Sequence, residues 1–422
     1  MTPAWLAGGR MKHVIIVGGG FAGLRAAKVL GGRRGVEVTL VDRHNHHVFQ
    51  PLLYQVAMAQ LSPADIAVPL RAVLARHANV RVYQGSVTGV DTAARRVDTS
   101  FGELTYDYLL LAAGASHSYF GHDDWEPLAP GLKTLEHARE IRRRVLAAYE
   151  AAECSRDAEQ QRRLLSFVIV GGGPTGVELA GAIAEMGRYT LARDFRNIHT
   201  ELTRVTLVEA GPRLLPALPS TLSEYSARAL QALGVEVLTG RAVTRITAAG
   251  AELGARRIEA GTVLWAAGVT ASPLGAMLDA ELDRQGRVKV EQDLSVPGRP
   301  ELFVAGDLAH FDLPGGATLP GIAAVAHQEG AHVARMILAD LEGRPRGPFR
   351  YFDKGQMATI GHNKAVAKLG PLLVRGRPAW FLWVFVHIYF LVDFRNRMVV
   401  MLQWAWTYLT NRRGARLIMD NS

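Results

Sequence analysis

Two glycine-rich turns constrain the fold of this 422-residue chain more than any other feature. Gly18–Gly23 follows the short apolar run Met11–Val17, and Gly171–Gly176 follows the apolar run Leu164–Val170. A helix-like stretch comes after each turn, so each set predicts a strand–turn–helix unit. In such a unit the glycines permit a tight turn, a close approach of the backbone to a pyrophosphate and close packing of helix against strand. The repeat therefore predicts an α/β chain with two dinucleotide sites, or a gene-duplicated scaffold.

An acidic residue ends the strand that we expect after each turn. Asp42 follows Val36–Val41, and Glu209 follows Val205–Val208. A carboxylate in this position is placed to accept a hydrogen bond from a ribose hydroxyl group. Glu209 also favours NADH over NADPH, because it would repel a 2′-phosphate, while Arg213 leaves NADPH open.

The second unit is longer than the first. Glu209 lies 38 residues after Gly171, whereas the usual spacing is about 20 residues. We therefore expect the helix that begins near Val177 to extend through Asn197.

Three later apolar strands end in small residues. They are Tyr108–Leu111 before Ala112-Ala113-Gly114, Thr262–Trp265 before Ala266-Ala267-Gly268, and Leu302–Ala305 before Gly306-Asp307. Asp307 has two interpretations, which are compatible with each other. It contacts the sugar–phosphate part of a cofactor, or it caps a helix that begins near Leu308.

A single cysteine, Cys154, excludes several kinds of redox chemistry. One thiol cannot make an intrachain disulfide, a dithiol centre, a cysteine-ligated zinc site or an iron–sulfur cluster. Any redox reaction must therefore use a bound organic cofactor, and we expect Cys154 to be inert on a surface connection. His44, His46 and His47 form a tight cluster. Because no further ligands follow at a set spacing, we expect a loop over the cofactor there and no metal.

The C-terminal region differs from the rest of the chain in charge and in aromatic content. Residues 343–422 contain 13 Lys+Arg and 3 Asp+Glu, a local charge of +10, whereas the whole chain carries +9. Four of the seven tryptophans lie here, namely Trp380, Trp383, Trp404 and Trp406. Basic charge combined with this apolar content favours a membrane surface over nucleic acid as the partner.

Two apolar runs in this region, Ala379–Val392 and Met398–Leu409, are separated by polar and basic residues. Each is shorter than the roughly 20 residues that span a bilayer. We expect two short amphipathic helices in the membrane interface, since basic residues flank both runs and Arg412, Arg413 and Arg416 follow the second. A buried core helix or a dimer helix is the alternative.

Three further segments have plain structural interpretations. Met1–Arg10 lacks the features of a targeting segment, and Met11 is a candidate natural start. We expect Arg139–Arg144 on the solvated face of a polar helix over Leu135–Ala152. His387 is expected to be a buried histidine whose hydrogen bonds are satisfied.

Several stretches are more specific than the glycine turns. They are Asp42–Ala57, which contains Phe49-Gln50-Pro51-Leu52-Leu53-Tyr54, then Gly171–Glu178, Gly306-Asp307, Phe394–Arg397 and Gln403–Trp406. Through them the chain, from about Met11 to Ile418, resembles the type II NADH dehydrogenases. These are single-chain, non-proton-pumping NADH:quinone oxidoreductases of the two-dinucleotide-binding-domain flavoprotein superfamily.

The resemblance implies a respiratory-chain enzyme. It passes hydride from NADH to non-covalently bound FAD and two electrons to a membrane quinone. It lies peripherally on the cytoplasmic side of the cell membrane, and a homodimer is one option. The implied architecture is two Rossmann-like domains, with an NAD(H) domain at residues 120–271 inserted between FAD-domain segments at 11–119 and 272–342, and a membrane-associating region at 343–422.

The resemblance also implies roles for individual residues. Those expected to hold FAD are Gly18, Gly20, Phe21, Ala22, Gly23, Asp42, Val87, Ala113, Gly114 and Asp307. Those expected to face NADH are Gly173, Gly176, Glu178, Glu209 and Gly268. Those expected on the quinone side are Gln50, Leu53, Tyr54, Ala324, His327 and Gln328.

Two of these residues, Glu178 and Gln328, are candidates for catalytic roles. Glu178 is interpreted as a group that orients NADH or relays a proton when buried, or as a first-turn acid favoured by the helix dipole. The family often has an Ala-Gln pair where this chain has Ala323-Ala324. Gln328 and His327 are therefore the remaining candidates to orient the quinone carbonyl.

Two other functions stay open at this point. A soluble NAD(P)H diaphorase or ferredoxin-type reductase shares the fold, but it does not need ten aromatic residues between Trp380 and Tyr408. A redox-sensing module would bind the dinucleotide and the membrane with little turnover. NADH oxidation with a water-soluble quinone and with ferricyanide separates these functions.

Overall fold

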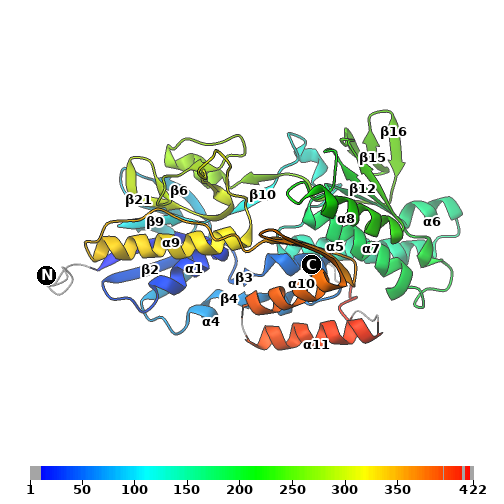
Figure 1. The fold of residues 1–422 in the computed structure, drawn as a ribbon, viewed down its shortest axis with the longest axis horizontal. Helices are drawn as coiled ribbons and strands as arrows, with labels where there is room; N and C mark the ends of the chain where they lie inside the picture. Colours follow the sequence, from blue (N-terminus) through cyan, green and yellow to red (C-terminus); the bar gives the residue numbers. More distant parts are fainter. Residues whose placement is uncertain (1–10, 393, 411–413, 419–422) are drawn as a thin grey trace. The chain divides into compact units, whose positions relative to one another are not determined.

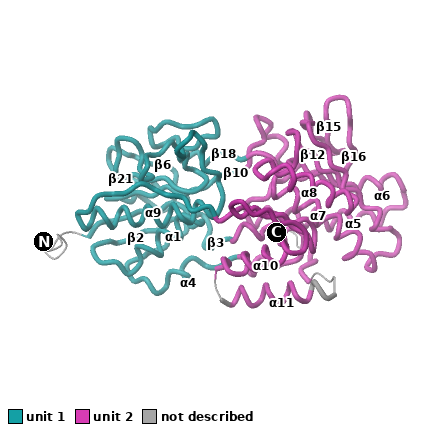
Figure 2. The backbone as a smooth tube through the Cα atoms, viewed as in Figure 1, with its two compact units in different colours: residues 1–48, 67–116, 269–353 teal, residues 49–66, 117–268, 354–422 magenta. Residues whose placement is uncertain are grey.

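The computed structural model describes residues 11–392, 394–410 and 414–418. The predictions for Met1–Arg10, Arg412 and Arg413 lie outside the described residues. The chain forms two compact units, each assembled from three separate segments (Figure 2). Unit 1 comprises the chain up to Val48, Ala67–Ser116 and Val269–Asp353, and unit 2 comprises Phe49–Ile66, His117–Gly268 and the chain from Lys354.

Unit 1 is built on a six-stranded sheet in the order β20-β21-β9-β1-β2-β5. Its strands β2, β9 and β21 are labelled in Figure 1. Its strands are β1 (Lys12–Val17), β2 (Val36–Asp42), β5 (Val80–Gln84), β9 (Tyr108–Leu111), β20 (Ser295–Val296) and β21 (Arg299–Val304). All neighbours are parallel except β20 and β21. The strands expected at the first glycine turn are therefore present.

The two faces of this sheet have different cover. Val14 and Ile16 of β1 share a core with the helices α1 (Phe21–Leu30) and α9 (Ala323–Leu341). The alternate residues of β1 lie in a second core with an antiparallel sheet. That sheet contains β6 (Val87–Asp91), β7 (Arg96–Thr99) and β8 (Gly102–Thr105).

Short elements complete unit 1. They are β3 (His46–Val48), β4 (Ala67–Pro69), α4 (Leu70–Leu74), β18 (Val269–Ala271), the 3₁₀ turns Pro273–Leu278 and Gly306–Leu308, β19 (Val288–Lys289) and β22 (Ala309–His310). β3 and β4 pair with each other, so His46 and His47 lie in a strand and not in the loop that we expected. β10 (Ala115–His117) pairs with β18. The helix expected from Leu308 is also absent, because the chain continues there as β22.

Unit 2 is built on a four-stranded parallel sheet in the order β13-β12-β11-β17. The strands are β11 (Ser166–Val170), β12 (Arg204–Glu209), β13 (Val235–Thr239) and β17 (Thr262–Trp265). One side carries a core shared with the antiparallel strands β14 (Arg245–Thr247), β15 (Gly250–Leu253) and β16 (Arg256–Glu259).

Helices surround this second sheet. They are α5 (Leu135–Cys154), α6 (Ala158–Leu164), α7 (Pro174–Glu185) and α8 (Ser220–Ala232), and earlier in the chain come the 3₁₀ turns Gln50–Leu52 and Asp123–Trp125 and the short helices α2 (Leu53–Ala57) and α3 (Pro63–Ile66). α7 packs against β11, β12 and α8, whereas α5 packs against β17 and α2. Cys154 is exposed at the end of α5.

The long second helix predicted through Asn197 is wrong. α7 ends at Glu185 and is followed by one π-helical turn at Met186–Thr190 and a 3₁₀ turn at Thr200–Leu202. The segment between these turns is held by Glu153 of α5. Its carboxylate accepts hydrogen bonds from the backbone N–H groups of residues 196–198, at 2.9 to 3.1 Å.

The last part of unit 2 combines a small sheet with two helices. The antiparallel strands are β23 (Gln356–Ile360), β24 (Lys364–Leu369) and β25 (Leu372–Gly376), followed by α10 (Arg377–Phe390) and α11 (Phe394–Thr410). α10 packs on β24 and β25, and α11 contacts α10 and α3. Two separate helices form where the two apolar runs predicted them. No helix in the described ranges combines the length and the apolar character needed to cross a bilayer.

Candidate functional site

The first glycine turn is fastened by Asp42. Its carboxylate accepts hydrogen bonds from the backbone N–H of Gly19, at 2.6 Å, and of His44, at 2.7 Å. Gly23 packs so closely that a Cβ atom would stand 1.8 Å from the carbonyl oxygen of Gly18. At Gly20 a Cβ atom would meet nothing within 4 Å. The turn is therefore tight on its inner side and open at Gly20, as a cradle for a pyrophosphate requires.

His47 also stabilises the first glycine turn. Its ring is buried, lies edge-on to Phe21 with 4.9 Å between ring centroids, and has Nδ1 3.0 Å from the carbonyl oxygen of Gly19. Burial lowers the pKa of His47 to about 4, so the ring is neutral at pH 7. Because a carbonyl oxygen only accepts, the proton sits on Nδ1 and donates to Gly19. His47 therefore stabilises the glycine turn. The sequence had suggested only that His47 belongs to a histidine-rich loop over the cofactor.

A second element of unit 1 lies at the carboxyl end of β21. Gly306 has a φ of +78°, and the atoms nearest to its Cβ position are the Cβ atoms of Ala326, at 3.5 Å, and Ala22, at 3.7 Å. The turn Gly306-Asp307 therefore lies beside the start of α1 and against α9. Asp307 in turn lies beside Gly321, whose Cβ position is 3.1 Å from Oδ1 of Asp307.

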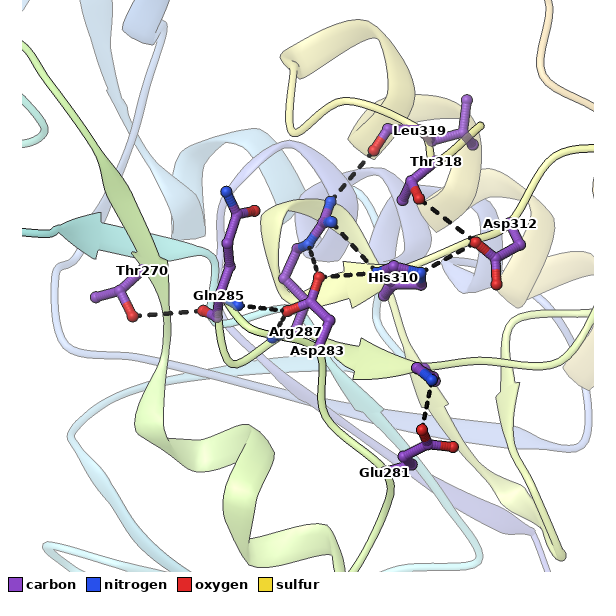
Figure 3. Close-up of polar contacts among 10 residues, drawn as sticks. Thr270, Glu281, Asp283, Gln285, Arg287, His310, Asp312, Thr318 and Leu319 are labelled. Carbon is purple, nitrogen blue, oxygen red and sulfur yellow. Dashed lines mark hydrogen bonds and ion pairs between the residues drawn. The ribbon is translucent and has the colours of Figure 1, made fainter. Parts of the chain in front are cut away.

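A polar network fixes the segment that leads from β22 to α9 (Figure 3). His310 has Nδ1 2.8 Å from Asp283 Oδ2 and Nε2 3.0 Å from Asp312 Oδ1. Arg287 donates to Asp283 Oδ2 at 2.7 Å and to the carbonyl oxygen of Leu319 at 3.4 Å. The network therefore ties both ends of the loop that carries Gly321 toward Asp307.

The other residues predicted to hold FAD also belong to unit 1. Gly114, with a φ of +69°, lies three residues after the end of β9. Val87 is the first residue of β6 and pairs with Thr99. Ala113 packs against the core on the β6 side of the sheet. The structure thus places the whole predicted FAD set in unit 1. Apart from Val87 in β6, these residues lie at the start of α1 or at or just after the carboxyl ends of β1, β2, β9 and β21.

The second glycine turn repeats the design of the first. Glu209 accepts hydrogen bonds from the backbone N–H of Gly172 and of Gly211, both at 2.6 Å. A Cβ atom at Gly176 would stand 1.8 Å from the carbonyl oxygen of Gly171. Gly173 has open space at its Cβ position within 4 Å. Unit 2 therefore holds a second cradle of the same kind.

Gly268 adds a further close approach in unit 2. It has a φ of +69°, and a Cβ atom there would stand 2.6 Å from the ring of Phe120 and 2.9 Å from the carbonyl oxygen of Ser118. A larger residue at position 268 would therefore have to move this loop. The predicted NADH set lies entirely in unit 2.

Glu178, in the second turn of α7, lines a pocket of unit 2. Tyr54, Thr359, His362, Trp380 and Trp404 are among the other lining residues. Burial raises the pKa of Glu178 to about 8, while a backbone N–H of Thr359, 3.5 Å from Oε1, opposes the rise. The carboxyl group is therefore mostly protonated at pH 7. The burial of Glu178 disfavours the alternative interpretation, in which Glu178 is a solvated acid of the first helical turn.

A chain of hydrogen bonds connects α11 to this pocket. The indole N–H of Trp404 donates to Gln55 Oε1 at 2.7 Å, and Gln55 Nε2 donates to the hydroxyl of Tyr54 at 3.0 Å. That hydroxyl lies 3.0 Å from Thr359 Oγ1. Thr359 is the residue whose N–H faces Glu178. Gln55 and Thr359 were not predicted from the sequence, because Gln55 meets Trp404, and Thr359 meets Tyr54, across more than 300 residues of chain.

The residues predicted on the quinone side are divided between the units. In unit 2, Gln50 is exposed, whereas Leu53 and Tyr54 are buried. In unit 1, Ala324 and His327 lie in the first turns of α9.

Gln328 of α9 already uses both ends of its amide group. Its Nε2 donates to the carbonyl oxygens of Ala324, at 3.1 Å, and Phe352, at 3.0 Å, and its Oε1 accepts from the backbone N–H of Phe352 at 3.0 Å. Gln328 therefore anchors the backbone at Phe352 in this conformation. A substrate oxygen would have to replace one of these partners.

α10 presents an exposed aromatic stripe. Phe381, Phe385 and Tyr389 lie four residues apart and are 60%, 69% and 61% exposed, so they share one helix face. Trp383 lies on the opposite face and is buried. His387 stacks on Trp383, with 4.1 Å between ring centroids, and bonds to its carbonyl oxygen at 2.8 Å. The expectation of a satisfied, buried histidine at 387 is met in part, because the residue is half-buried and its Nδ1 is hydrogen-bonded.

The expectation for Arg139–Arg144 is wrong at one residue. Arg143 and Arg144 pair with Glu140 near the surface. Arg142, however, is buried and donates to the carbonyl oxygen of Ala415 at 3.2 Å. It connects α5 with the C-terminal segment. The described residues contain no cluster of His, Cys, Asp or Glu that could hold a metal ion.

Comparison with known proteins agrees with this geometry. Residues 12–330 match the family model described as pyridine nucleotide-disulphide oxidoreductase, and residues 354–413 match the NDH2 C-terminal domain. The chain is 44% identical to the type II NADH:quinone oxidoreductase Ndh of Mycobacterium tuberculosis, over 97% of this chain and 91% of that protein. It is 30% identical to the type II NADH:quinone oxidoreductase of Haemophilus influenzae, over 89% and 93%.

Solved structures show the same fold. NDH2 from Plasmodium falciparum, solved in complex with NADH, superposes with a TM-score of 0.87 at 19% identity and covers 97% of this chain and 100% of that chain. The sulfide:quinone oxidoreductase of Aquifex aeolicus superposes with a TM-score of 0.72 at 20% identity, over 92% of each chain. The fold class and the family predicted from the sequence are confirmed, and this chain belongs to the type II NADH:quinone oxidoreductases.

Proposed function

We propose that this chain is an FAD-dependent enzyme that oxidises NADH and reduces a quinone at a membrane surface. The observation that carries the proposal is the presence of two glycine cradles of one design, one in each unit, each fastened by its own carboxylate. One cradle serves a resident dinucleotide and the other a dinucleotide substrate. When bound, FAD supplies the acceptance of hydride and the donation of two electrons. No nucleophilic side chain is needed.

We assign the FAD cradle to unit 1. Its open position at Gly20 and the N-terminus of α1, which begins without a side-chain cap, suit a pyrophosphate. The residues proposed to hold FAD are Gly18, Gly20, Phe21, Ala22, Gly23, Asp42, Val87, Ala113, Gly114 and Asp307. Asp42 uses one oxygen for each of two backbone N–H groups, and each oxygen keeps a lone pair for a ribose hydroxyl.

We assign the NADH cradle to unit 2. The proposed contacts are Gly173, Gly176, Glu178, Glu209 and Gly268. Glu209 disfavours a 2′-phosphate, because its carboxylate already carries negative charge at the ribose position. The domain division proposed from the sequence, with the NAD(H) domain at residues 120–271 between two FAD segments, follows the same assignment.

Glu178 is proposed as the group that holds a proton beside the reaction. Reduction of a quinone consumes two protons, and a carboxyl group with a pKa of about 8 is protonated at pH 7 yet able to give its proton up. On the quinone side we propose Gln50, Leu53, Tyr54, Ala324, His327 and Gln328. His327 and Gln328 are the candidate partners of a quinone carbonyl, and the amide group of Gln328 already holds the backbone of Phe352.

The exposed stripe of α10 is proposed as the membrane contact. Its aromatic residues suit the interface of a bilayer, and the basic residues of the C-terminal region suit anionic lipid headgroups. We propose the cytoplasmic side of the cell membrane as the location of the enzyme, because anionic lipids are concentrated there. A homodimer is a further proposal, tested by the mass of the purified protein in solution.

The experiment is an assay of the purified protein for bound flavin and for NADH oxidation. We expect a yellow protein that turns over with a water-soluble quinone and turns over faster with a lipophilic quinone in liposomes. A colourless protein that takes up no flavin refutes the proposal. Turnover with ferricyanide but not with any quinone indicates a diaphorase, and bleaching by NADH without turnover indicates a sensor.

A further inference from the structure

Glu329 of α9 is a buried carboxyl group that the proposed chemistry does not use. It is 1% exposed. The other acid in the same helix, Asp340, is paired with Arg346 and accepts a hydrogen bond from Tyr108. Within the described residues Glu329 has no such ion pair. A buried carboxyl group without a cation is costly, so an apolar side chain would be the simpler solution for packing.

The partner of Glu329 is the turn that carries Asp307. The backbone N–H of Gly306 donates to Glu329 Oε2 at 2.6 Å. Burial and the nearby Asp307 raise the pKa of Glu329 to about 8. The buried carboxyl group of Glu329 therefore accepts a hydrogen bond from one specific backbone N–H group, that of Gly306.

The position of this bond explains why it matters. Gly330, the next residue of α9, lies so close to α1 that a Cβ atom would stand 2.0 Å from the carbonyl oxygen of Ala22. Gly306 lies beside Ala22 and Ala326. Glu329 thus lies where α9, the start of α1 and the turn Gly306-Asp307 meet. Its hydrogen bond holds this turn against the two helices.

We propose that Glu329 is a positioning residue, which holds the Gly306-Asp307 turn against α9 so that Asp307 is aligned toward the bound flavin cofactor. The inference rests on the assignment of FAD to unit 1. Glu329 acts through the backbone of Gly306 and does not touch the cofactor itself.

The test compares two variants of almost equal side-chain size. Glu329→Gln keeps an oxygen that accepts from Gly306, whereas Glu329→Met has a similar length without that acceptor. Glu342→Gln, an exposed acid just after α9, is the matched control. The measurements are the rate at which FAD leaves the purified holoenzyme on dilution and the visible absorption spectrum of the bound flavin.

We expect FAD to leave Glu329→Met about ten- to a hundredfold faster than the wild type, because a buried backbone donor is left unpaired. Its flavin spectrum should also shift. The rate of FAD release from Glu329→Gln should stay within about threefold of the wild-type rate, because the amide oxygen still accepts from Gly306. The rate for the control Glu342→Gln should stay within the same range. If Glu329→Met does not fold, Glu329→Leu with hydrogen exchange of residues 302–310 supplies the same comparison.

Two outcomes overturn the inference. FAD release from Glu329→Met at the wild-type rate means that the bond does not position the turn. Equal loss in Glu329→Gln and Glu329→Met means that the acceptor is not what matters. Failure of the wild-type protein to bind flavin refutes the proposed function instead, so the two failures are distinct.

Discussion

The raised pKa of Glu178 makes a direct prediction about stability. In the unfolded chain this carboxyl group titrates near 4.5, and in the folded chain near 8. Between these values the folded state binds more protons than the unfolded state. The free energy of unfolding therefore falls as pH rises through this window. The stabilising proton is fully present below about pH 4.5 and is lost as pH rises through about 8.

The size of the effect follows from the same pKa. One pH unit inside the window corresponds to about 1.4 kcal/mol. From pH 6 to pH 9 about two units lie below the folded pKa, which gives at most about 2.7 kcal/mol. Glu178 faces a pocket that solvent can enter, so we expect about 1 to 2 kcal/mol. Glu178→Gln has no such titration, and its free energy of unfolding should fall by that much less over this range.

Urea unfolding at pH 6 and pH 9 measures this difference. Six of the seven tryptophans belong to unit 2, so their fluorescence reports on the unit that contains Glu178. The titration of Glu329 is common to both proteins and cancels. Glu224→Gln, an exposed acid of α8, is the control and should follow the wild type. An equal fall for the wild type and Glu178→Gln would refute the assigned environment of Glu178.

Three further perturbations test other parts of the molecule. Trp404→Phe removes the indole donor to Gln55 and should lower the free energy of unfolding by about 1 to 3 kcal/mol in urea unfolding, while a loss below about 0.5 kcal/mol contradicts the hydrogen-bond chain. Asp283→Asn should destabilise the protein at pH 7 but not near pH 2. Hydrogen bonds from His310 and Arg287 outweigh the effect of burial and lower the pKa of Asp283 to about 2, so the stability that the carboxylate contributes is lost as the pH falls toward 2. A difference in thermal stability between variant and wild type that persists at pH 2 contradicts this. Phe385→Ser with Tyr389→Ser should weaken sedimentation with anionic liposomes at least about tenfold and leave NADH oxidation with ferricyanide unchanged, whereas unchanged sedimentation removes the stripe from the membrane contact.

Local pattern was enough to predict the strands and turns around both cradles. The strands at Tyr108–Leu111 and Thr262–Trp265 have the predicted bounds, because continuous apolar runs between turn residues leave little choice. The segment after α7 was predicted wrongly for the opposite reason. Spacing alone suggested more helix through Asn197, but Glu153 binds the backbone there from a different helix. No local pattern reports such a contact.

The side-chain partners were less predictable than the elements. Sequence position correctly selected Asp42 and Glu209 as the acids at the second strand ends, but it did not reveal that each also fastens its own glycine turn. Gln55 and Glu329 were missed, since each acquires its role only through a partner distant in sequence. A glutamate among the mainly apolar buried residues of α9 was the signal available for Glu329.

The double role of Asp42 and Glu209 bears on how a cofactor is recognised. A flexible carboxylate would lose side-chain entropy when it bound a ribose. Here both oxygens of each carboxylate are already held by backbone N–H groups at 2.6 to 2.7 Å, so that cost is met during folding. The same bonds hold the glycine turn in the shape that receives the pyrophosphate. If the proposed cofactor assignment holds, one residue in each cradle contributes to recognition of both the sugar and the phosphates, and loss of either acid should weaken both together.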